Sequence, residues 1–125
     1  MKIAVVDGLP FVEVELSHQG ASITLSSVLL DTGSAGTIFD VEHMAEIGIR
    51  SAPHDIIHRV SGIGGSEFVI LKRVEALAID GSLLADVEIE IGALEYGFPL
   101  DGILGLDCLM RFGAVIDLSA LELRV

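Results

Sequence analysis

The stretch Val28–Ser34, with the sequence VLLDTGS, places the carboxylate of Asp31 directly behind an apolar run. A lone carboxylate at the end of a core strand is costly to bury unless another group favours its ionised form. Two carboxylates brought together can instead share one proton, so that one acts as base and the other as acid. Gly33 permits a close approach of two chains, and Thr32 or Ser34 can supply hydroxyl hydrogen bonds. The stretch therefore allows two interpretations: a strand that ends in an ordinary turn, or a site that needs a shielded Asp.

The composition predicts one mainly β domain that spans residues 1–125. Hydrophobic residues make up 51% of the chain, but aromatic residues only 5%, so the core must be built from Val, Ile and Leu. Many of these residues are β-branched, which favours sheet. A chain of 125 residues is too short for two domains. Because no apolar run approaches the roughly 18 residues of a membrane span, and no signal segment is recognisable, we expect a soluble, cytoplasmic protein.

Charge and potential metal ligands narrow the function further. The net charge of −12 argues against nucleic acid as a partner, because phosphate contacts need clustered Lys and Arg. The single Cys108 excludes an internal disulfide and lies in an apolar stretch, so a buried thiol is predicted. His54 and His58 are four residues apart, and Ile56 and Ile57 between them suggest a strand, in which two residues at this spacing lie too far apart to bind one ion. We therefore expect surface histidines and neither a metal nor a cofactor.

Alternating apolar and polar residues, separated by turn signals, predict about eight short strands. Two short helices are predicted as well, one over Val41–Ile47 with Asp40 as its N-cap and one over Leu104–Phe112 that ends at Gly113. Such a protein hides its strand edges in a closed or sandwiched sheet. The predicted strands are Ile3–Val6, Phe11–Leu16, Ala21–Leu30, Ile56–Val60, Glu67–Leu71, Val74–Ile79, Val87–Ile91 and Ala114–Val125.

Two further motifs follow the Asp-Thr-Gly stretch. Ser61–Ser66, with the sequence SGIGGS, places a lone Ile among glycines. An Ile side chain exposed in a glycine-rich loop gains no stability from burial unless it packs over another group. Leu100–Gly113, with the sequence LDGILGLDCLMRFG, passes from an apolar strand end through a glycine directly into a helix.

Taken in order, the three motifs resemble those of retropepsin-like aspartic proteases, in particular the cellular and bacterial branch. Members of this family show apolar-apolar-Asp-Thr-Gly-Ala/Ser, then a glycine-rich flap, then apolar-Ile/Leu-Leu-Gly before a short helix. The corresponding segments here are Leu29–Ser34, Ser61–Ser66 and Gly102–Gly105. The resemblance covers roughly Leu9 to Leu123. It implies a closed, acid-protease-like β-barrel of short strands with one or two short helices and a flap hairpin.

The resemblance also implies roles for individual residues. Asp31 would be the catalytic carboxylate of an aspartic endopeptidase. Thr32 would hydrogen-bond across a dimer and, with Gly33 and Ser34, support the active site. Gly33 would also let the backbone of the substrate pass.

Substrate binding would involve the flap and the floor of the site. Ile63, between Gly62 and Gly64, would form the flap tip that closes over the peptide. Ile103 would line a side-chain pocket, with Ile38 and Leu100 as its companions.

One departure from the viral members concerns substrate binding. Viral proteases carry acidic residues at the positions of Ala35 and Gly36, which grip the substrate main chain, and an Arg at the position of Leu106 that partners one of them. All three are replaced here by apolar residues or glycine. A virus-like grip and specificity are therefore not expected.

The chain contains a single Asp-Thr-Gly, so the partner of Asp31 would be Asp31 of a second subunit in a C2 homodimer. The sequence Ile79–Ser82 has the wrong residue order and predicts a hairpin turn. The dimer could form through an intersubunit sheet of Ile3–Val6 and Leu121–Val125, or through helix and loop contacts. Two alternatives to a general peptidase stay open: a dimerisation or peptide-binding module with little turnover, and a protease that cleaves only its own precursor or one partner.

Overall fold

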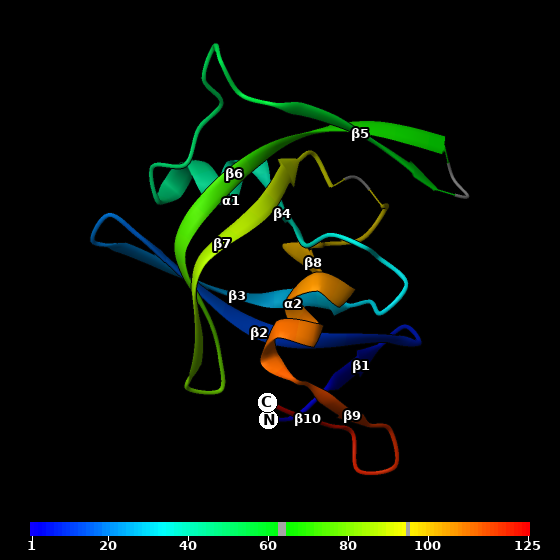
Figure 1. Ribbon diagram of the computed structural model, residues 1–125. Helices are drawn as coiled ribbons and strands as arrows, with labels where there is room; N and C mark the ends of the chain where they lie inside the picture. Colours follow the sequence, from blue (N-terminus) through cyan, green and yellow to red (C-terminus); the bar gives the residue numbers. More distant parts are fainter. Residues whose placement is uncertain (63–64, 95) are drawn as a thin grey trace.

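Ten strands and two short helices form within residues 1–62, 65–94 and 96–125, the parts of the chain that the computed structural model describes. Both helices are short, and none among the described residues has the length and apolarity needed to cross a membrane. The elements, labelled in Figure 1, are β1 (Ala4–Val6), β2 (Leu9–His18), β3 (Ala21–Leu30), β4 (Ile38–Asp40), α1 (Val41–Glu46), β5 (Ile57–Gly62), β6 (Gly65–Ile79), β7 (Ser82–Gly92), β8 (Gly102–Leu104), α2 (Leu106–Phe112), β9 (Val115–Asp117) and β10 (Glu122–Arg124).

Eight of these strands form one sheet that curls into a ring. Their order is β1-β2-β3-β8-β4-β7-β6-β5, and an additional pairing of β2 with β6 closes the ring. The largest fully buried side chains include Leu16, Phe39, Met44, Leu77 and Leu104, which belong to one hydrophobic core cluster. The prediction of a mainly β protein with a closed sheet and two short helices is confirmed.

Helix α1 begins where the sequence predicts. The carboxylate of Asp40 accepts a hydrogen bond from the backbone N–H of Glu42 at 3.3 Å, as an N-cap does. Helix α2, however, begins at Leu106 and not at Leu104, because Leu104 extends β8 and pairs with Leu30 of β3. Gly105 is extended and separates the two elements.

The prediction of two strands at Glu67–Leu71 and Val74–Ile79 is wrong, because β6 runs unbroken through both segments. Lys72 and Arg73 continue the ladder with β7. Their charges are accommodated by ion pairs, with Lys72 Nζ 2.7 Å from Asp55 and Arg73 Nε 3.0 Å from Asp86. Strand β4 was not predicted at all.

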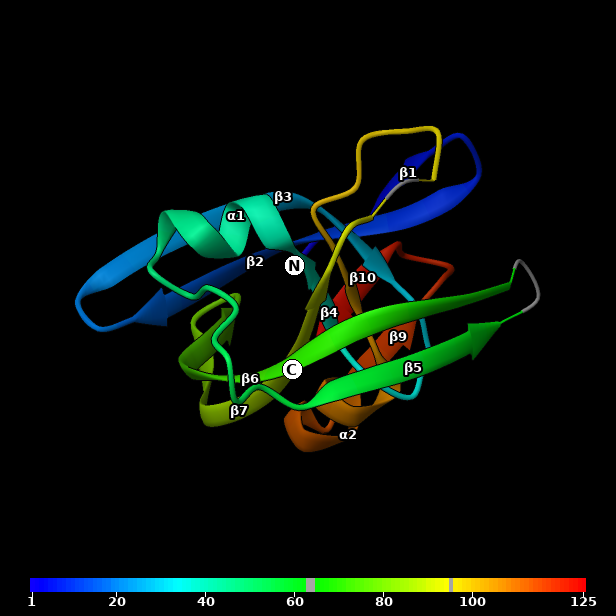
Figure 2. The same ribbon diagram turned by 90° about the horizontal axis from the view of Figure 1, so that it is seen from above.

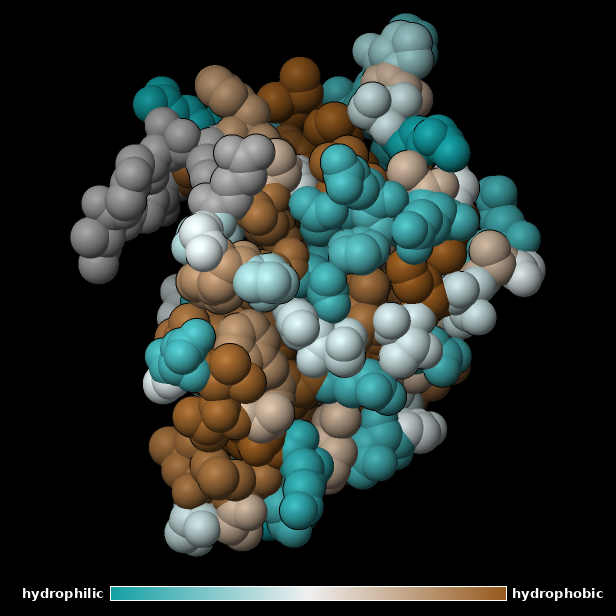
Figure 3. Space-filling view, turned by 180° about the vertical axis from the view of Figure 1, so that it is seen from behind, coloured by the Kyte–Doolittle hydropathy of each residue, from teal (hydrophilic) through white to brown (hydrophobic). Residues whose placement is uncertain are grey.

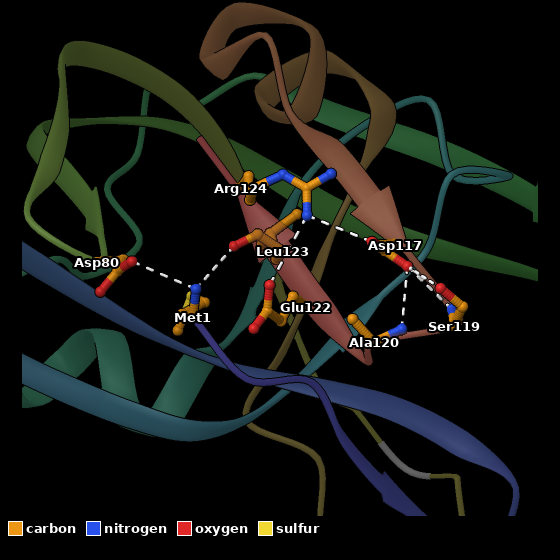
Figure 4. Close-up of polar contacts among 8 residues, drawn as sticks. All are labelled: Met1, Asp80, Asp117, Ser119, Ala120, Glu122, Leu123 and Arg124. Atoms are coloured by element: carbon orange, nitrogen blue, oxygen red, sulfur yellow. Dashed lines mark hydrogen bonds and ion pairs between the residues drawn. The ribbon is translucent and has the colours of Figure 1, made fainter.

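The segment Ala114–Val125 is a hairpin of two strands and not the single strand that its alternation predicts. Its turn is organised by Asp117, whose carboxylate accepts hydrogen bonds from Ser119 and Ala120 (Figure 4). These hydrogen bonds and the nearby Arg124 lower the pKa of Asp117 to about 2.

The two ends of the chain pair with each other within one subunit. The amino group of Met1 donates to the carbonyl of Leu123 at 2.8 Å and lies 3.3 Å from Asp80 (Figure 4). The N–H of Leu123 donates back to the carbonyl of Met1 at 2.9 Å. Strand β10 therefore has β9 on one edge and the N-terminal residues on the other.

Candidate active site

Asp31 follows the last residue of β3 and begins a tight loop. Its N–H donates to the carbonyl of Leu104 at 3.1 Å, which extends the parallel pairing of β3 with β8. The N–H of Gly33 donates to Asp31 Oδ1 at 2.9 Å, and the N–H of Ser34 donates to the Asp31 carbonyl at 3.3 Å. The loop thus orients the carboxylate through its own backbone amides.

A buried threonine supports this loop from beneath. Thr37 is 1% exposed, and its hydroxyl accepts from the N–H of Gly105 at 3.0 Å and donates to Asp107 Oδ1 at 2.8 Å. The N–H of Leu106 donates to the carbonyl of Ser34 at 2.7 Å. These contacts join the loop to the start of α2. The sequence analysis did not single out Thr37, because its role depends on this contact between distant segments.

Gly105 allows the loop and the helix to approach closely. A Cβ atom at this position would overlap with the carbonyl oxygen of Gly36 and would lie 2.8 Å from that of Ser34. The backbone angles of Gly105 are accessible to any residue, so glycine is required here for space.

The loop forms the floor of a cleft of about 490 Å³. Figure 1 shows the β5–β6 hairpin arching over the side of the molecule where β3 ends, and Figure 2 shows the same hairpin from above. The described residues that line the cleft are Asp31, Gly33, Ser34, Ala35, Gly36, Ile38, His58, Arg59, Val60, Val69, Glu90, Tyr96 and Ile103.

The predicted pocket residues divide into two groups. Ile38 and Ile103 pair directly across β4 and β8 and both line the cleft. Leu100 packs in the same apolar cluster but is 7% exposed and lies outside the described cleft lining. The two hydroxyl residues of the Asp31 loop differ in their surroundings. The Ser34 hydroxyl donates to the Gly36 carbonyl at 2.8 Å, whereas Thr32 is exposed.

The predicted flap residues are described only in part. Gly62 is the last residue of β5, and its backbone pairs with that of Gly65 in β6. Ile63 and Gly64 lie outside the described residues. The structure thus contains the expected hairpin, while the role of its tip stays a prediction.

Glu90 is a cleft residue that the sequence analysis missed. It lies on β7 opposite Ile38, and its N–H donates to the carbonyl of Thr37 at 2.9 Å. Burial raises the pKa of its carboxyl group, and repulsion from Asp107 adds to that effect. The sequence signal that could have pointed to Glu90 is Gly36. A Cβ atom at Gly36 would lie 2.9 Å from Glu90 Cδ, so a glycine there leaves space for the Glu90 side chain.

The potential metal ligands among the described residues do not lie together at one point. Within the described part of the chain, no group of three or more His, Cys, Asp or Glu side chains is placed to hold a metal ion. Cys108 is free and buried, as predicted, and burial raises the pKa of its thiol. His43 Nε2 lies 2.9 Å from Asp101, away from the cleft lining.

Comparison with known proteins identifies the protein family and the fold of this chain. A model of the aspartyl protease family matches residues 12–108, and the chain belongs to this family. No curated protein sequence matches the chain significantly. Among solved structures, a retropepsin-like aspartic protease from Rickettsia conorii is similar, with a TM-score of 0.69 and 18% sequence identity over 99% of this chain and 97% of that one. The fold is therefore that of a retropepsin-like protease.

Proposed function

We propose that this chain is an aspartic endopeptidase that works as a homodimer, with Asp31 of each subunit acting on one water molecule. The observation that carries this proposal is the position of Asp31 in an open cleft, on a loop where Gly33 also lines the cleft and donates a hydrogen bond to the Asp31 carboxylate. Peptides or proteins would be the substrates, bound in an extended form between the floor and the flap.

The chemistry follows from pairing two carboxyl groups around one proton. The ionised group takes a proton from water, whose oxygen attacks the carbonyl carbon of the peptide bond. The protonated group donates its proton to the substrate during the reaction, and the leaving nitrogen departs as an amine. One water is consumed, and no covalent intermediate with the protein forms.

The second carboxylate of the pair has to come from another subunit. Glu90 is a further carboxylate in the cleft, but the charges that act most strongly on it are those of His58, Asp107 and Glu88, and Asp31 is not among them. Glu90 is therefore a poor candidate for the partner of Asp31. A second copy of the chain supplies the missing group by symmetry.

The described surface next to Asp31 supports contacts through α2. An apolar groove of about 160 Å³ lies between Thr32, Met110 and Ile116. Met110 is 71% exposed and Leu106 is 41% exposed. A second subunit seated there would lie directly beside the Asp31 loop. Both edges of β10 are occupied in its own subunit, which supports helix and loop contacts over an intersubunit sheet that uses β10.

Strand β1 is a second candidate part of the interface. It is the end strand of the large sheet, and Val5 and Val6 are both more than half exposed. Seen from behind, hydrophobic residues gather on the side of the molecule where β1 lies (Figure 3). We also propose a cytoplasmic location, which the single unpaired Cys108 supports.

The experiment that tests the proposal is a peptide-library digest by wild type and Asp31→Asn from acidic to neutral pH. We expect cleavage by the wild type only, with both proteins folded and dimeric in sedimentation. Cleavage by Asp31→Asn would refute the assigned residue. A wild type that binds peptides without cleaving them at any pH would favour the peptide-binding module.

A further inference from the structure

The cleft contains a carboxylate for which the proposed reaction has no use. Glu90 is half-buried in the cleft wall, and its backbone is fixed on both sides, with Leu71 of β6 as one partner and Ile38 of β4 as the other. Strand pairing places these residues on the same face of the sheet. Its carboxyl group is therefore built into the wall and does not belong to a loose surface side chain.

This carboxyl group has no donor within the described residues, neither a hydrogen bond nor an ion pair. The charged groups that act on it most strongly are His58 on β5, Asp107 at the start of α2 and Glu88 on the same strand. Two of these three are acidic. A half-buried carboxylate in such surroundings is stabilised by a ligand that brings a positive charge and hydrogen-bond donors.

The surroundings of Glu90 also define the shape of that ligand. Ile38 and Val69 line the cleft beside it and meet at Gly92, where a Cβ would lie 3.5 Å from Ile38 Cδ1 and 3.3 Å from Val69 Cγ1. At Gly36 there is no side chain, and the Glu90 carboxyl group fills that space. An apolar wall beside an acidic group fits a side chain with a methylene stem and a cationic end.

We infer that Glu90 is a specificity-determining residue that selects a lysine or arginine side chain of the peptide bound in the cleft. The inference rests on the proposed function, because it needs a peptide in the cleft. In a C2 dimer the second copy of Glu90 occupies the equivalent wall across the two-fold axis. The selection therefore applies at two substrate positions, one on each side of the cleaved bond.

The test compares peptides that differ only in lysine or norleucine at one position, scanned along a cleaved sequence. We expect wild type to favour lysine about tenfold or more in kcat/KM at one position on each side of the cleaved bond, the scale of a charge-assisted hydrogen bond. Glu90→Gln brings the ratio close to one, and Glu90→Lys favours a glutamate peptide. Glu88→Gln is the matched control, because Glu88 lies on the same strand outside the cleft lining and keeps the wild-type ratio.

Two results would overturn the inference. One is a lysine-to-norleucine ratio that Glu90→Gln leaves unchanged. The other is an equal loss of activity towards both peptides in Glu90→Gln, which would assign Glu90 to the substrate main chain.

A binding measurement separates this inference from the proposed catalysis. Asp31→Asn is titrated with the lysine and norleucine peptides and compared with the double variant Asp31→Asn/Glu90→Gln. Tighter binding of the lysine peptide, lost in the double variant, supports Glu90 even if wild type cleaves nothing. Equal or no binding of both peptides by Asp31→Asn overturns it even if wild type is an active peptidase.

Discussion

The loop that carries Asp31 and the wall that carries Glu90 present carboxylates to the same cleft but hold them differently. Asp31 receives a hydrogen bond from Gly33 in its own loop, and Thr37 and Gly105 fix that loop from beneath. Glu90 has a fixed backbone, but its carboxyl group has no donor among the described residues. The difference fits the two proposed roles, in which Asp31 is oriented in advance for chemistry and Glu90 is left open for a ligand.

The largest effect expected on the loop side comes from Gly105→Ala. The new Cβ would overlap with the backbone of Gly36, so the loop or α2 must shift. We expect a loss of about 3 kcal/mol in the free energy of unfolding, measured in urea, together with loss of peptidase activity. Gly20→Ala is the control, because Gly20 has φ +82 but open space around it, and about 1 kcal/mol of backbone strain is expected. Equal losses in the two variants would contradict the close approach.

Thr37→Val tests the polar support of the same loop. The substitution keeps the shape of the side chain but leaves the N–H of Gly105 and the carboxylate of Asp107 without their partner. We expect a loss of about 2 kcal/mol in the free energy of unfolding. Thr24→Val on the exposed face of β3 should change it by no more than about 0.5 kcal/mol. A neutral Thr37→Val would show that the loop does not depend on this hydroxyl.

Asp117 is a third carboxylate to compare with Asp31 and Glu90, and it accepts its hydrogen bonds in a turn at the protein surface. Its low pKa of about 2 means that its contribution to stability is full above the ordinary aspartate range and lost as the pH falls through about 2. The melting temperature of Asp117→Ala should therefore lie below that of wild type at pH 7, and the gap should narrow towards pH 2. Asp86→Ala removes an exposed carboxylate paired with Arg73 and should have little effect. A gap that does not depend on pH would contradict the role of the charge.

The smallest effect on stability is expected for Glu90→Gln, which should raise the melting temperature and not lower it. Because burial raises the pKa of Glu90, the folded protein binds this proton more tightly than the unfolded chain does. Wild-type stability therefore falls as the pH rises from the ordinary glutamate range through the raised pKa. Glu90→Gln should melt slightly above wild type at neutral pH and together with it in acid, whereas Glu88→Gln should not. A lower melting temperature at neutral pH would show that Glu90 has a stabilising partner.

Local sequence signals predicted the elements whose causes are local. Strand β3 coincides with the predicted Ala21–Leu30, because its alternation and flanking turn both lie within it. Asp40 marks the start of α1 because an N-cap acts on residues next to it. The motif around Asp31 was found because Asp, Thr and Gly adjoin in the chain. Asp31 and Gly33 line the cleft, and their roles in catalysis stay a prediction.

The errors concern features that depend on distant partners. The two strands predicted in place of β6 left Lys72 and Arg73 between them, but Asp55 and Asp86 from other segments pair with these two charges. In β7, the alternation of Glu and Ile places Glu90 on the polar face of a strand. Only the parallel pairing of β7 with β4 brings that face into the cleft, and no local pattern specifies such a pairing.

The central claim is that one chain holds half of an active site. The most direct measurement is the peptidase activity of dimers reassembled from wild type and Asp31→Asn in varying proportions, with total protein constant. If each site needs Asp31 from both subunits, activity follows the square of the wild-type fraction, so that one quarter wild type gives about one sixteenth of full activity. Activity in direct proportion to the wild-type fraction would show that each chain works alone and would contradict the claim.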